Sequence, residues 1–325
     1  MRNLKKDPIK LGILGCGSFA TRRILPAAQE AGIIKITCLQ KRDLAAGRKI
    51  AETFHIPHVV TSRDELLSHL DVEAVMICTP NHMHEEDALA CAFHKMPTLC
   101  EKPLAPTSLA IKNMLQAFQN SYTLFFVGHS LRFKPCVLQT KKLLQEHALG
   151  ELLRIRVHFS IPVPKESWKY KKAFGGGVLQ DIGVHLIDFI HFISDQEIIS
   201  ISAMANIEEV DQTVLASFRL SNGALASLEC SFESPLDSGF EVVGSKSRLV
   251  SYASLRQTLD PVESFCHILE DGTKVYFPVQ ASNVYVEELK HFATSIIEKK
   301  SSIIPAEIAL KNALIIEEIY TKLLA

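Results

Sequence analysis

The chain has 325 residues, 47% of them hydrophobic, and a formal net charge of −1 at pH 7. This length favours two domains with sizeable cores, and the near-neutral charge argues against a nucleic-acid or membrane partner. The eight cysteines form no CxxC pair, the first residues are mostly polar, and no apolar run is as long as a membrane span. We therefore expect a cytoplasmic protein without a metal site.

The first regular element is an apolar strand that begins at Ile9 and leads into a glycine turn. A helical pattern follows and ends at Gly32. The spacing Gly15-x-Gly17-x-x-Ala20 fits the dinucleotide fingerprint, in which the first glycine makes the turn and the second admits the pyrophosphate. The third small residue lets the helix pack on the strand, and the helix N-terminus attracts the negative charge. The segment predicts a nucleotide site.

A second strand is expected over 34–39, and Gln40, Lys41, Arg42 and Asp43 follow it. An NAD-binding fold usually offers an acid to the adenosine ribose at this point, whereas two cations suit the 2′-phosphate of NADP. Asp43 could instead turn toward the ribose, and the two cations could simply belong to a solvated loop. We favour NADP and keep NAD as possible.

Up to about residue 125, apolar runs alternate with amphipathic stretches, which predicts a doubly wound parallel sheet. The expected strands after the first are 34–39, 58–60, 73–78, 97–100 and 123–128, and the clearest helices are 43–54, 84–95 and 107–118. Polar motifs follow two of the strands, at 79–84 and 101–103, where such folds bind their ligands. Pro80 and Pro103 could also serve only to end strands.

From about residue 150, closely spaced strands predict a large, mostly antiparallel sheet. They are expected at 151–161, 198–207, 212–220, 224–233, 239–244, 247–252 and 263–269, with closing helices at 284–299 and 305–324. One further helix follows the glycine run at 175–177 and carries Asp181 and His185. Residues four apart share a helix face, so this carboxylate and imidazole could form an acid/base pair. They could equally cap or line a buried helix.

Several further motifs occur in a characteristic order. They are residues 79–84 (TPNHMH), 101–103 (EKP), 132–135 (RFKP), 175–188 (GGGVLQDIGVHLID) and 285–288 (YVEE). With the glycine fingerprint, they resemble the glucose–fructose oxidoreductase/inositol dehydrogenase (Gfo/Idh/MocA) family over essentially the whole chain. The resemblance implies an α/β protein with a Rossmann domain over 1–125. It also implies a substrate-binding α/β domain over 126–325, whose open sheet would join a homodimer or homotetramer.

The resemblance also implies roles for single residues. Lys102 would be the catalytic lysine that stabilises charge on a substrate oxygen, and His185 would exchange the hydroxyl proton. Asp181 would orient the substrate, and Glu101 would accept hydrogen bonds from the nicotinamide ribose. The cofactor-binding residues are expected to be Gly15, Gly17, Ser18, Phe19, Ala20, Lys41, Arg42, Thr79, Pro80, Asn81, His84, Glu101, Lys102, Arg132 and Trp168.

Two members of that set have a structural alternative. His84 stands at a helix start, where we expect a structural role more often than a catalytic one. Trp168, the single tryptophan of the chain, is as compatible with simple packing as with a cofactor contact.

These observations predict an NAD(P)-dependent dehydrogenase or reductase. It would transfer a hydride between the nicotinamide cofactor and a hydroxyl or carbonyl carbon of a small-molecule substrate: a sugar, sugar derivative or cyclitol. One alternative is a redox-neutral enzyme that cleaves glycosides with bound NAD. Another is a non-catalytic regulatory protein, although such a protein has no chemical need for Lys102, Asp181 and His185 together.

Overall fold

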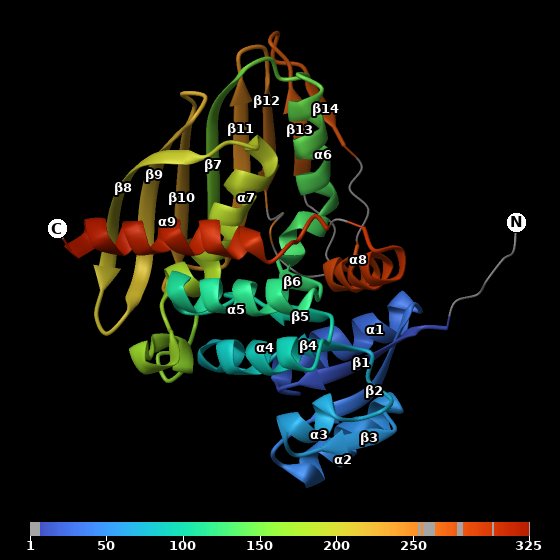
Figure 1. Cartoon of the computed structure of the whole chain (residues 1–325). Helices are drawn as coiled ribbons and strands as arrows, with labels where there is room; N and C mark the ends of the chain where they lie inside the picture. Colours follow the sequence, from blue (N-terminus) through green and yellow to red (C-terminus); the bar gives the residue numbers. More distant parts are fainter. Residues whose placement is uncertain (1–6, 253–254, 256–263, 278–281, 301, 325) are drawn as a thin grey trace, which may run out of the picture. The chain divides into compact units, whose positions relative to one another are not determined.

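The computed structural model describes residues 7–252, 255, 264–277, 282–300 and 302–324 (Figure 1). Contacts divide the chain into two compact units. Unit 1 comprises Met1–Gly128 with Tyr285–Leu310, and unit 2 comprises His129–Val284 with Lys311–Ala325. The change of unit after Gly128 lies close to the change in sequence pattern at 125, while the C-terminal part of the chain is shared between the units.

Unit 1 contains a parallel sheet of six strands within its described residues, in the order β3-β2-β1-β4-β5-β6. The strands are β1 (Ile9–Leu14), β2 (Ile34–Gln40), β3 (His58–Val60), β4 (Ala74–Ile77), β5 (Thr98–Glu101) and β6 (Phe125–Gly128). The strand order reverses between β1 and β4, and doubly wound sheets bind their ligands at the carboxyl ends of such neighbours. The predicted fold class of the first half is confirmed.

Helices pack beside these strands in unit 1, and three of them begin at a side-chain cap. They are α1 (Leu25–Ala31), α2 (Leu44–Phe54), α3 (Arg63–Leu67), α4 (His84–Phe93), α5 (Ser108–Ser121) and, from the C-terminal part, α8 (Val284–Glu298). Asp43, Ser62 and Thr107 cap α2, α3 and α5 with their side-chain oxygens. Gly32 ends α1 in the left-handed conformation, as the sequence predicts. Helices α4 and α5 lie side by side (Figure 1).

Unit 2 contains an eight-stranded sheet among its described residues, in the order β14-β13-β12-β11-β7-β10-β9-β8. The strands are β7 (Leu152–Ser160), β8 (Ile198–Ile207), β9 (Asp211–Leu220), β10 (Leu225–Ser231), β11 (Asp237–Gly244), β12 (Arg248–Tyr252), β13 (Ser264–Ile268) and β14 (Lys274–Tyr276). Among the described strand pairs of this sheet, only β7–β10 is parallel, so the predicted mostly antiparallel sheet is confirmed. The sequence did not predict β14, because three residues are too short to show a period.

The core of unit 2 lies between this sheet and the helices α6 (Pro135–Gln145) and α7 (Val184–Ser194), with part of α9 (Glu307–Leu324). Helix α7 contacts β7 and β10 and lies against the sheet in Figure 1. Among the described residues, the segment Lys172–Ser194 is long and apolar enough to cross a membrane, but 67% of its most apolar window is buried. Its burial is that of a core helix.

Candidate functional site

The glycine turn after β1 combines one tight contact with one open position. Gly15 has φ +78°, and a Cβ there would lie 2.6 Å from the backbone nitrogen of Thr79, so the turn packs directly on the end of β4. At Gly17 a Cβ would meet only the Gly15 carbonyl oxygen, at 4.0 Å. Gly17 and Ser18 are exposed, whereas Ala20 is fully buried where the helix starts. The open space at Gly17 and the nearby helix N-terminus fit a dinucleotide pyrophosphate.

The end of β2 folds onto this turn. The Gly15 amide donates to Gln40 Oε1 at 3.1 Å, and Lys41 Nζ donates to the Cys16 carbonyl at 3.0 Å. Asp43 accepts a hydrogen bond from the Ala46 amide at 3.0 Å and thereby caps α2. Asp43, which the sequence left open as a ribose ligand, thus serves as a helix cap, while Lys41 lies over the glycine turn.

The loops after β4 and β5 are joined by His84, which is 1% exposed. Its Nε2 lies 2.8 Å from the Thr79 carbonyl oxygen and its Nδ1 lies 3.0 Å from that of Pro103. Burial lowers the pKa of His84 against the opposing effect of these carbonyls, so the ring is neutral and donates to one of them. Buried Asn81 follows Pro80 in the first loop. The contacts of His84 are those of a residue that fixes both loops.

Glu101 and Lys102 end β5 at the same edge of the sheet. The Lys102 amide donates to Glu101 Oε2 at 3.3 Å, and the following Lys102–Pro103 peptide is cis. Burial raises the pKa of Glu101 to about 7, although the Lys102 ammonium opposes that shift. A Cβ on Gly128 of β6 would lie 3.2 Å from Glu101 Oε1, so the glycine permits the carboxyl group to sit against the neighbouring strand. A buried carboxyl that titrates near neutrality marks this edge as a candidate site.

In unit 2, Asp181 forms an ion pair that the sequence did not reveal. Asp181 lies in a π-helical turn, Leu179–Gly183, that precedes α7, and its Oδ2 is 2.5 Å from Lys169 Nζ. Such turns occur frequently at functional sites. The helix that the sequence predicts after the glycine run therefore begins with a widened helical turn. The sequence did not point to Lys169 as a candidate site residue. The feature that could have indicated it is its position directly after Trp168, whose side chain is 45% exposed.

His185 is the second residue of α7 and is 4% exposed. Its ring centroid is 6.2 Å from that of His129, whose Nε2 lies 3.6 Å from Asp188 Oδ1. Arg132 donates two hydrogen bonds to Asp188, at 2.8 and 2.7 Å, and Asn312 donates a third at 3.1 Å. Burial opposes ionisation of Asp188, but Arg132 holds its pKa well below the usual range. Arg132, expected among the cofactor ligands, has its guanidinium paired with Asp188 in the interior of unit 2.

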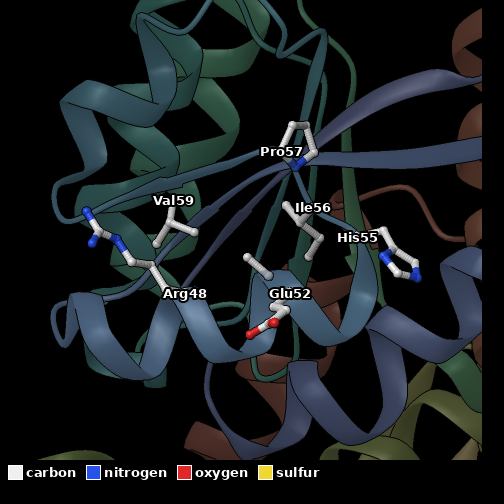
Figure 2. Close-up of a pocket in the computed structure, with 7 residues that line it drawn as sticks. Arg48, Glu52, His55, Ile56, Pro57 and Val59 are labelled. Atoms are coloured by element: carbon white, nitrogen blue, oxygen red, sulfur yellow. The ribbon is translucent and has the colours of Figure 1, made fainter.

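A hollow on unit 1 lies away from the glycine turn and Lys102. Figure 2 shows its lining side chains, which are Arg48, Ala51, Glu52, His55, Ile56, Pro57 and Val59. The chain passes here from the end of α2 into the start of β3, so most of this lining lies toward the amino edge of the parallel sheet. The glycine turn and Lys102 lie at the carboxyl edge, where the ligand site is expected.

The same amino edge carries a group with the chemistry of metal ligands. One ligand atom each of His58, His69 and Asp71 lies within 4.8 Å of the others. Asp71 already pairs with Lys10 at 2.8 Å and with His58 at 3.3 Å, and its own amide donates to His69 Nδ1. Since Lys10 supplies a positive charge to this carboxylate, we assign no metal to the group.

Comparison with known proteins covers most of the chain. An oxidoreductase family model, the Gfo/Idh/MocA NAD-binding Rossmann fold, matches residues 9–129, and the Gfo/Idh/MocA C-terminal domain matches residues 137–250. The 1,5-anhydro-D-fructose reductase of Ensifer adhaerens is 27% identical over 294 residues, which cover 88% of this chain and 87% of that protein.

Two solved structures share the fold. Levoglucosan dehydrogenase in complex with NADH and levoglucosan has a TM-score of 0.88 at 21% identity, over 98% of both chains. KijD10, a 3-ketoreductase from Actinomadura kijaniata in complex with NADP and TDP-benzene, has a TM-score of 0.88 at 23% identity. It covers 97% of this chain and 98% of its own.

Proposed function

Because the chain belongs to the Gfo/Idh/MocA family of NAD(P)-dependent oxidoreductases, we propose that it oxidises or reduces a sugar, sugar derivative or cyclitol. The observation that carries this proposal is the open space at Gly17, beside the point where the strand order reverses. Bound there, a nicotinamide dinucleotide would supply the redox chemistry. The relatives named above reduce or oxidise sugar derivatives, which supports this substrate class.

The proposed catalytic residues have different roles, which follow from their charges. The Lys102 ammonium stabilises negative charge on the substrate oxygen, and His185 takes the hydroxyl proton or returns it in the reverse direction. Asp181 orients the substrate together with Lys169, its partner at 2.5 Å. An ion pair at this position leaves little net charge, which suits an uncharged polyol.

Turnover assays test the function directly. The purified protein is offered polyols, sugars, sugar nucleotides and hydroxy acids with each nicotinamide cofactor, in both directions, while nicotinamide absorbance is followed. We expect net turnover with at least one polyhydroxylated substrate. Turnover confined to hydroxy acids contradicts the proposed substrate class. Glycoside cleavage without net cofactor conversion indicates a redox-neutral enzyme, and cofactor binding without any conversion indicates a regulatory protein.

Gly17→Val is expected to abolish dinucleotide binding without unfolding the protein. The new side chain enters space that is empty of protein atoms, so the fold tolerates it, but it occupies the place of the pyrophosphate. Cofactor titration by fluorescence, with thermal unfolding as the measure of folding, checks this result. Gly15→Ala is the contrasting variant, because its Cβ would clash with the Thr79 backbone and it should lose stability as well. A folded Gly17→Val protein with unchanged affinity contradicts the assignment.

We further propose NADP as the preferred cofactor. Lys41 lies across the glycine turn, exposed Arg42 follows it, and Asp43 is engaged as a helix cap. The site therefore offers cations rather than an acid to the 2′ position.

Arg42→Ala is expected to weaken NADP binding by about tenfold or more, because a charge-assisted hydrogen bond contributes roughly 1.5–3 kcal/mol. NAD affinity should change by less than about twofold, since NAD carries no 2′-phosphate. Titrating both cofactors into the wild type and the variant measures both effects. Arg48→Ala, which removes another exposed arginine on α2, is the matched control and should change neither affinity. Equal losses for NADP and NAD rule out phosphate recognition by Arg42.

We also propose a homodimer or homotetramer through the sheet of unit 2, in the cytoplasm. Met204, Leu215 and Tyr252 belong to one row of paired residues across β8 to β12 and are 75%, 49% and 60% exposed. The paired row that includes Ile201 and Ile155 lies on the other face of the sheet and is buried in the core. Exposed apolar side chains across one sheet face favour self-association, which sedimentation measures.

The eight free cysteines, seven of them buried, suit a reducing compartment and thus support the proposed location in the cytoplasm.

A further inference from the structure

Helix α8 belongs to unit 1, and its inward face is defined by two ring contacts. Tyr285 meets Phe19, just after the glycine turn, with ring centroids 5.6 Å apart and edge to face. Phe292 meets Phe126 of β6 in the same manner at 5.2 Å. Residues three, four and seven apart share a helix face. Glu288 therefore lies between Tyr285 and Phe292, on the face that packs against the interior of unit 1.

Glu288 is completely buried, and this burial is unusual for its side chain. Both of its carboxyl oxygens are inaccessible and have no hydrogen-bond partner among the described residues. The same holds for Glu101 Oε1, and the negative charge of Glu101 acts on Glu288. A buried carboxyl without partners requires an explanation, because burying it ionised costs several kcal/mol.

The other titratable groups around the two carboxyls come from the loop after β4, from β5 and from the loop after β5. Lys102 is the cation that acts on Glu101, and the thiols of Cys78 and Cys100 adjoin the acids. Burial raises the pKa of both thiols well above 9.0, so they stay neutral. Burial, and then repulsion by Glu101, raises the pKa of Glu288 well above 4.5. Lys102 thus supplies one positive charge for two acids, and this charge balances the negative charge of only one of them.

We infer that Glu288 is a positioning residue that stays protonated and shares one negative charge with Glu101, beside the proposed nicotinamide ribose site. Two neighbouring carboxyls in a buried site cannot both ionise without a large repulsion. Because the neutral acid places no second charge beside its neighbour, Glu101 can ionise and act as an acceptor near neutral pH. The consequence for cofactor binding rests on the proposed role of Glu101 as a ligand of the ribose hydroxyls.

The sign of a pH shift tests this inference. Cofactor affinity should rise with pH as Glu101 ionises near pH 7, since a carboxylate is the better acceptor for hydroxyl groups. Glu288→Gln keeps a neutral side chain with a donor and should move the midpoint by less than about 0.3 pH units. Glu288→Leu is neutral as well and should likewise move the midpoint by less than about 0.3 pH units.

The opposite results overturn the inference. If Glu288 were ionised, both variants would remove a repelling charge and lower the midpoint. Glu287→Gln is the matched control on the same helix, because Glu287 is half-exposed and pairs with Lys290 at 3.0 Å. It should leave the midpoint where it is.

A second readout separates this inference from the proposed function. The infrared spectrum of the cofactor-free protein should contain the stretching band of a buried protonated carboxyl at pH 8, and Glu288→Gln should remove it. If Glu288→Gln removes the band but Glu101→Gln leaves cofactor affinity undiminished, the pair exists and Glu101 is not a ribose ligand. An unchanged band in Glu288→Gln refutes the protonated state of Glu288 whatever Glu101 binds.

Discussion

Replacing Lys102 by Met or His185 by Ala is expected to lower turnover by about a hundredfold or more while cofactor affinity stays within about threefold. The first variant removes the charge that we assign to the substrate oxygen, and the second removes the acid/base group, whose usual contribution is 10²–10⁴-fold. Initial rates on a substrate identified by screening, together with cofactor titration, measure the two effects.

The controls for this experiment are Lys112→Met and His94→Ala, which replace exposed residues of α5 and of the end of α4. They should retain full turnover. Because His185 is buried, its variant also needs a thermal unfolding measurement to separate loss of chemistry from loss of structure. Near-wild-type turnover in both test variants contradicts the catalytic assignment.

Asp188→Ala is expected to destabilise unit 2 by about 3–5 kcal/mol, the usual cost of removing one partner of a buried ion pair. The change leaves the Arg132 guanidinium, at 6% exposure, without the carboxylate to which it donates two hydrogen bonds. Asn312 loses an acceptor as well. Urea unfolding followed by circular dichroism measures the loss.

The comparison variant is Glu197→Ala, which breaks the exposed pair of Glu197 with Lys311 and should cost less than about 1 kcal/mol. The Asp188 effect should also depend on pH. Since Arg132 depresses the folded-state pKa of Asp188 below 3.8, its stabilisation is present above that value and is lost as the pH falls below it. Equal losses in the Asp188 and Glu197 variants would show that the buried pair contributes no more than a surface pair.

The sequence alone predicted the architecture because the signals involved are local. Apolar runs such as 34–39 and 73–78 repeat along the first half and are separated by helical periods, and this alternation is compatible with few folds other than a parallel sheet. The observed strands Ile34–Gln40 and Ala74–Ile77 agree within two residues. Gly15 was also identified correctly as a tight turn, since its positive φ is a property of a few adjacent residues.

The neighbours of the candidate site residues were decided by tertiary structure. Asp181 pairs with Lys169, twelve positions earlier, and Arg132 pairs with Asp188, which lies 56 positions away. Asp43 looked like a possible ribose ligand in the sequence, but the start of α2 uses its carboxylate as a cap. Each partnership depends on which helix face turns inward, and a polar residue in a sequence does not reveal that.

The sequence by itself therefore determined the family fold, because backbone periodicity and turn geometry act over a few residues, and it supplied the residues of the candidate site. Only the tertiary structure decided how the charges are partnered. Glu288 lies 187 positions after Glu101, yet packing of α8 places both carboxyls in one interior. There burial and mutual repulsion, which no local pattern encodes, set the ionisation of the pair.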